Sequence, residues 1–133
     1  MSEINDKDIA PLVMVIDDEP AVRSLIQHIL VEAGYRVEAV PDGAVALARL
    51  EACAPDVVIT DVVMEPLDGI EVMRDIRKLL PEIPIIAMSG GGRLGSNQYL
   101  QMCVRLGAKS TIEKPFRPGE LLRVVEDAIT SCK

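Results

Sequence analysis

Ionisable residues stand at the ends of three short apolar runs in this sequence. Asp17 and Asp18 follow the first run, Asp61 follows another, and Lys114 follows the last. Three carboxylates brought together repel each other unless a cation joins them. A hard divalent ion such as Mg²⁺ prefers oxygen ligands of this kind, and a lysine opposite it would complete a site for a phosphoryl group. The four residues therefore indicate phosphate chemistry on an aspartate, provided that the fold brings them together.

The alternation of short apolar runs with helical patterns supplies such a fold. We expect strands at 12–16, 36–40, 57–60, 85–88 and 109–113, and helices at about 22–30, 44–52, 70–80, 98–106 and 121–129. Repeated strand–helix units are typical of a parallel sheet with helices on both faces. All strand exits of such a sheet lie along one edge, where these folds bind ligands. The ionisable residues should therefore meet in one crevice.

Length and composition limit the possible functions. The 133 residues fit one domain, with residues 1–11 as a short polar arm and 12–131 as the folded unit; no output domain is expected after the last helix. A net charge of −7 and only three Tyr or Phe residues argue against a nucleic-acid partner, because phosphate backbones require clustered Lys and Arg and single strands require aromatic stacking.

Cysteine usage and the N-terminus indicate the compartment. Cys53, Cys103 and Cys132 are widely spaced and odd in number, which fits a reducing environment better than a disulfide framework or a zinc site. The first residues carry no secretory signal, and no stretch of 18 apolar residues occurs. We therefore expect a cytoplasmic protein without a membrane partner.

Several separated motifs, in this strand–helix order, resemble the receiver domain of response regulators of the chemotaxis type. They are Asp17-Asp18, Asp61, Met64, Asp68-Gly69, Ser89 and Lys114-Pro115-Phe116. The resemblance covers about residues 12–131. It implies a flavodoxin-like, doubly wound, five-stranded parallel sheet of order 2-1-3-4-5 in a single domain.

The resemblance also implies a role for each matching residue. Asp61 would be the nucleophile and phosphoacceptor, forming an acyl phosphate. Asp18 and Asp61 would bind Mg²⁺ directly, with the backbone carbonyl of Val63 as the third protein ligand and Asp17 acting through a water. Aspartate is also favoured at a helix N-cap, so one of the pair could cap the first helix as well. For Asp61 the structural alternative is a solvated aspartate that caps a helix.

Two further residues complete the implied site. Lys114 would pair with the Asp61 carboxylate and later with a phosphoryl oxygen, and the Lys114–Pro115 peptide bond is usually cis in the family. Ser89 would donate a hydrogen bond to the phosphoryl group. The alternatives are a surface lysine and a plain serine at the end of a buried strand.

The implied function is that of a single-domain response regulator. It would take a phosphoryl group from a histidine kinase or a histidine phosphotransfer protein and signal by binding an unknown downstream protein. It would catalyse only its own phosphorylation and dephosphorylation. The resemblance places the docking surface on the first helix and the loop after the last strand, with candidates Arg23, Ser24, Gln27 and Pro118.

The sequence departs from the family pattern at three places. Glu65 stands where a proline usually follows Met64, Thr111 replaces an aromatic switch residue, and the loop 89–96 is rich in glycine and longer than usual. We therefore expect this loop to be mobile, and the start of the fourth helix to be shifted. Coupled movement of Ser89 with an aromatic side chain is excluded in its usual form.

These departures keep other functions open. One is a receiver fold that signals by association without phosphorylation. Another is a Mg²⁺-dependent phosphatase, although the chain lacks the D-x-D nucleophile motif such an enzyme would need. The dinucleotide fingerprint at Gly90, Gly92 and Gly95 follows the fourth strand rather than opening the sheet, so it does not predict nucleotide binding.

Overall fold

The computed structural model describes residues 10–61, 68–90, 101, 103–105 and 107–130. In chain order the elements are β1 (Leu12–Ile16), α1 (Pro20–Glu32), β2 (Arg36–Val40), α2 (Gly43–Ala52), β3 (Val57–Asp61), α3 (Asp68–Leu79), β4 (Ile85–Gly90), β5 (Ser110–Lys114) and α5 (Pro118–Thr130). Residues 101 and 103–105 are helical, as predicted for the fourth helix. The rest of that helix, Val63, Glu65 and most of the glycine-rich loop lie outside the described residues.

The five strands form one parallel sheet in the order β2-β1-β3-β4-β5. Every neighbouring pair is parallel and continuously in register. The predicted fold class and strand order are therefore confirmed. In the described part of the chain, no helix is both long and apolar enough to cross a membrane.

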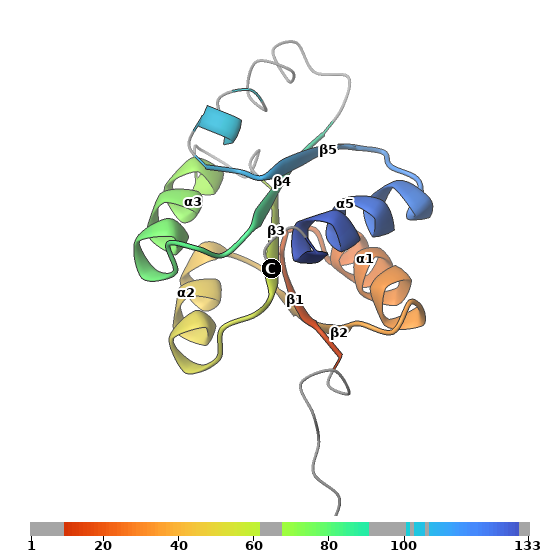
Figure 1. Cartoon of the computed structure of the whole chain (residues 1–133), viewed down its shortest axis with the longest axis horizontal. Helices are drawn as coiled ribbons and strands as arrows, with labels where there is room; N and C mark the ends of the chain where they lie inside the picture. Colours follow the sequence, from red (N-terminus) through yellow and green to blue (C-terminus); the bar gives the residue numbers. More distant parts are fainter. Residues whose placement is uncertain (1–9, 62–67, 91–100, 102, 106, 131–133) are drawn as a thin grey trace, which may run out of the picture.

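The sheet separates two apolar layers, one on each face (Figure 1). Alternate residues of each strand point to opposite faces. Met14, Val58 and Ala87 therefore pack with α2 and α3, whereas Val15 and Ile59 pack with α1 and α5. These layers consist largely of Val, Ile, Leu, Met and Ala, which agrees with the aliphatic core expected for a chain with so few aromatic residues.

Tight turns set the ends of the helices. Asp42 caps α2 by accepting a hydrogen bond from the Val45 N–H at 2.9 Å. Gly34 follows α1 with φ of +99°, a conformation that glycine adopts without strain. Gly43, the first residue of α2, lies so close to Val72 of α3 that an added Cβ would overlap that side chain. Asp42 and Gly43 follow β2, so the start of α2 is closely packed against α3 at the carboxyl edge of the sheet.

Three strands extend further than the sequence predicted. β3, β4 and β5 include Asp61, Ser89 and Lys114 rather than ending before them. The cause is the neighbouring ladder, in which Asp61 pairs with Met88 and Gly90 pairs with Lys114. The backbones of these three site residues are thereby held by the sheet itself and not by loops.

Candidate functional site

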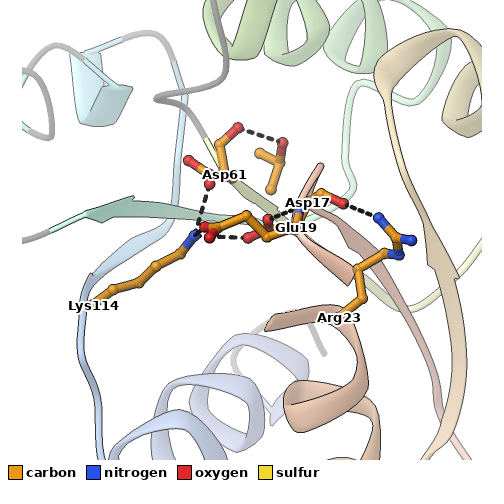
Figure 2. A network of polar contacts seen from close by, with 6 residues as sticks. Asp17, Glu19, Arg23, Asp61 and Lys114 are labelled. Atoms are coloured by element: carbon orange, nitrogen blue, oxygen red, sulfur yellow. Dashed lines mark hydrogen bonds and ion pairs between the residues drawn. The ribbon is translucent and has the colours of Figure 1, made fainter. Parts of the chain in front are cut away.

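Lys114 connects two buried carboxylates at the carboxyl edge of the sheet (Figure 2). Its Nζ lies 2.8 Å from Asp17 Oδ2 and 2.7 Å from Asp61 Oδ2. Asp17 is fully buried and Asp61 is 5% exposed. The Lys114–Pro115 peptide bond is cis, as the resemblance implied. Residues nearly a hundred positions apart are thus joined where three strands end.

All the polar groups of Asp17 have partners. The carboxylate accepts from Lys114 at Oδ2 and from the Glu19 backbone N–H at Oδ1, at 2.9 Å. The backbone N–H of Asp17 donates to the Val40 carbonyl at 3.2 Å, and its carbonyl accepts from the guanidinium of Arg23 at 2.8 Å. The orientation of this aspartate is therefore fixed on every side.

For Asp17 and Lys114, burial and hydrogen bonding shift the pKa in opposite directions. Burial raises the pKa of the Asp17 carboxyl, and the nearby Asp61 charge adds to this, although the Lys114 hydrogen bond acts against it. Burial alone would lower the pKa of Lys114, but its hydrogen bonds to Asp17 and Asp61 outweigh this effect and raise it. One lysine stays charged, and it does not fully compensate the carboxylates around it.

Two exposed carboxylates add to this negative surplus. Carboxylate oxygens of Asp17, Asp18, Glu19 and Asp61 all lie within 4.8 Å of one another. Such a set of hard oxygen donors is what Mg²⁺ prefers. The residues at the edge therefore fit a divalent cation. The sequence interpretation missed Glu19, whose place directly after Asp17-Asp18 was the available signal.

Of the other residues singled out in the sequence, Ser89 and Thr111 are described by the structure and Val63 is not. Ser89 is fully buried and follows Met88, the partner of Asp61 in the ladder. Its strand alternation matches that of Ala87, whose side chain packs toward α2 and α3. Thr111 is half-buried beside Ala87 in the β4–β5 ladder. Val63 falls outside the described residues, so its carbonyl remains a prediction.

The first helix differs from expectation at its start. Its N-cap is Glu19, without a side-chain cap, so neither Asp17 nor Asp18 caps it. The physical reason is that Asp17 Oδ1 binds the N–H two residues on, before the helix begins. Among the docking candidates, Ser24, Gln27 and Pro118 are exposed. The half-buried Arg23 instead turns its guanidinium toward Asp17.

Comparison with known families identifies this arrangement. The model of the response regulator receiver domain matches residues 13–126, most of the chain. The chain belongs to the response regulator receiver domain family. The receiver domain is a module of two-component signalling.

Relatives of this receiver domain are found both as whole proteins and as parts of longer ones. The chemotaxis protein CheY of Thermotoga maritima is 32% identical over 86% of this chain and 91% of its own length. The nitrogen assimilation regulatory protein NtrX of Azorhizobium caulinodans is 30% identical over 91% of this chain. The crystal structure of the NtrX receiver domain from Brucella abortus is 33% identical, with a TM-score of 0.84, covering 90% of this chain and 98% of that one.

The relatives differ widely in length. The chain spans only 26% of the Azorhizobium NtrX and 33% of a Trichodesmium erythraeum protein-glutamate methylesterase/protein-glutamine glutaminase. The activities of those longer proteins therefore belong to them and are not established for this chain.

Proposed function

We propose that this chain is a response regulator that accepts one phosphoryl group on Asp61 and signals by binding another protein. The observation that carries this proposal is Lys114 Nζ, which lies within 2.8 Å of both Asp17 and Asp61. The lysine ammonium is a compact charge on a flexible side chain, so it can move from one anionic partner to another. Such an exchange is what formation of an acyl phosphate requires.

The proposed transfer starts from a phosphohistidine on a kinase or a phosphotransfer protein. An Asp61 carboxylate oxygen attacks phosphorus, the new O–P bond forms, and the P–N bond of the donor breaks. The imidazole nitrogen leaves with the electron pair and takes up a proton. Lys114 keeps its charge throughout and follows the anion as it moves from carboxylate to phosphoryl oxygen. Ser89 is proposed to donate a hydrogen bond to that phosphoryl group.

The acidic edge is proposed to hold Mg²⁺. Asp18 and Asp61 would be direct ligands with the Val63 carbonyl, and Asp17 would act through a water. The contacts of Asp17 support its indirect role, since both its carboxylate oxygens already accept hydrogen bonds from the protein. When bound, the cation neutralises charge on the transferring phosphoryl group, as in other phosphoryl transfers.

We further propose that residues 12–131 form the receiver unit, with residues 1–11 as a polar arm, and that it acts in the cytoplasm. The chain would catalyse only its own phosphorylation and dephosphorylation. The output would be association with an as yet unidentified protein, through a loop movement that does not need an aromatic residue at Thr111.

Intact mass after incubation with Mg²⁺ and phosphoramidate tests this function. The wild-type chain should gain one phosphoryl group and Asp61→Asn none. Asp56→Asn is the matched control, because the Asp56 carboxylate accepts a hydrogen bond from a backbone N–H at the other edge of the sheet. This variant should be phosphorylated like the wild type. Absence of any gain, also with a panel of histidine kinases, would favour signalling by association alone. Steady turnover of unrelated phosphate esters would favour a phosphatase.

A further inference from the structure

One positively charged side chain of α1 turns back to the acidic edge and contacts the backbone there. The Arg23 guanidinium donates to the backbone carbonyl of Asp17 at 2.8 Å, as Figure 2 shows. The side chain is half-buried, and its own backbone N–H donates to the Glu19 carbonyl at 3.0 Å. Arg23 therefore holds the turn between β1 and α1 from inside the first helical turn.

This turn carries the residues that would face the cation. Asp17 and Asp18 are adjacent, and Asp17 is already fixed at its N–H by Val40 and at its side chain by Glu19 and Lys114. The carbonyl is its remaining polar group, and it lies on the peptide that links the two aspartates. The Arg23 contact thus sets the orientation of that peptide and, with it, the direction in which the Asp18 side chain leaves the backbone.

We propose that Arg23 is a positioning residue for the cation site, holding the Asp17–Asp18 peptide so that both carboxylates face the same point. This inference rests on the proposed Mg²⁺ dependence. Residues that orient metal ligands through hydrogen bonds govern affinity strongly although they never touch the ion. The role differs from docking, for which Arg23 was a sequence candidate, because the guanidinium is engaged inside the molecule.

The sign of the effect separates positioning from simple charge. A positive guanidinium near a cation site repels the ion, so its removal should tighten Mg²⁺ binding if charge alone mattered. If Arg23 positions the ligands, its removal should weaken binding. The two explanations therefore predict opposite shifts in the dissociation constant.

Calorimetric titration of the full chain with Mg²⁺, without any phosphodonor, measures this shift. Arg23→Met keeps much of the side-chain stem and removes the donor, and we expect its dissociation constant to rise about tenfold. Arg23→Lys keeps a charged donor and should recover part of the affinity. Arg36→Met is the matched control, since the Arg36 guanidinium also donates to a backbone carbonyl, that of Ala10, at 2.8 Å but away from the acidic edge. It should bind like the wild type.

The outcomes are separable. Unchanged or tighter binding by Arg23→Met, with the wild type binding normally, would overturn the positioning role and leave the proposed function intact. A wild-type chain that binds no Mg²⁺ would overturn the metal dependence and the positioning role together. Circular dichroism and thermal unfolding in chelator verify that each variant is folded. Should Arg23→Met not fold, Arg23→Gln, which removes the charge and shortens the donor, must show the same weakening.

Discussion

The two edges of the sheet both carry charged side chains, but they use them differently. At the amino edge, Arg77 of α3 donates to the carbonyls of Pro81, Ile83 and Gly107, at 2.7 to 2.8 Å. Asp56 accepts from the Leu12 N–H at 2.7 Å at the same edge. These charges are matched with backbone groups, which no reaction of the protein alters.

At the carboxyl edge, charged side chains mainly face each other. Lys114 forms ion pairs with Asp17 and Asp61, and its Nζ lies 3.6 Å from the carboxylate of the exposed Glu19. A cation or a covalent change on one of these groups alters the balance for all of them. The comparison teaches that the amino edge matches its charges with fixed backbone groups, whereas most charges of the carboxyl edge depend on one another and stay adjustable.

Removal of Lys114 should have the largest effect on this comparison. Lys114→Met leaves Asp17 and Asp61 buried without their cation, and losing one member of a buried pair costs about 3 kcal/mol. Urea unfolding at pH 7 in chelator should show this loss, and Mg²⁺ should restore part of it by binding the folded state. Lys78→Met, on the exposed side of α3, is the control. If Lys114→Met were as stable as the wild type, the negative charges of Asp17 and Asp61 would not depend on Lys114 for their compensation.

Removal of Arg77 should have a smaller effect of a different kind. Arg77→Met deprives three carbonyls of their donor, and because parts of the cluster are exposed to water we expect a loss of about 2 kcal/mol in urea unfolding. Mg²⁺ should not relieve it, and phosphoryl uptake should stay at the wild-type level. The exposed Arg74 on the same helix provides the control substitution to Met. Loss of phosphoryl uptake in Arg77→Met alone would contradict the division between the edges.

Neutralising Asp17 should have the smallest effect, with the opposite sign. The pKa of Asp17 is raised in the folded protein, first by burial, so its stabilising contribution belongs to low pH and is lost as the pH rises through the folded value. At pH values above it, the buried carboxylate is ionised and opposes folding. Lys114 keeps Asp61 as its partner, so in that pH range Asp17→Asn should raise the unfolding free energy in chelator by about 1 kcal/mol, while weakening Mg²⁺ binding.

The pH profile makes this prediction sharper. The advantage of Asp17→Asn over the wild type should shrink as the pH falls below the folded pKa of Asp17, because the wild-type carboxyl then becomes neutral too. Asp56→Asn at the amino edge should bring no such gain. If Asp17→Asn destabilised the chain at pH 7, the hydrogen bonds of this carboxylate would outweigh the burial of its charge.

The sequence was sufficient to predict the sheet and the meeting of the ionisable residues. Strand–helix alternation fixes a parallel sheet, and parallel strands end at a common edge, so Asp17, Asp61 and Lys114 had to converge. The predicted ends of three strands were one or two residues too early. The neighbouring ladders carry Asp61, Ser89 and Lys114 within the strands, and ladder length depends on pairing that the local sequence does not contain.

Individual contacts could not be predicted from residue type. The burial of Asp17 and the exposure of Asp18 depend on a turn in which one carboxylate binds a backbone N–H two residues ahead. The sequence placed Arg77 only within the helix predicted at about 70–80. Its acceptors at Pro81 and Ile83 follow closely in the chain, but only the fold brings the Gly107 carbonyl to the same guanidinium.

The division of the core by the sheet has a consequence for how the protein can vary. The residues packed under α2 and α3 and those packed under α1 and α5 form separate clusters. Substitutions in one cluster should therefore change stability independently of those in the other, with additive effects. One side of the molecule can then acquire new sequences, and with them new binding preferences, while the packing on the other side is inherited unchanged.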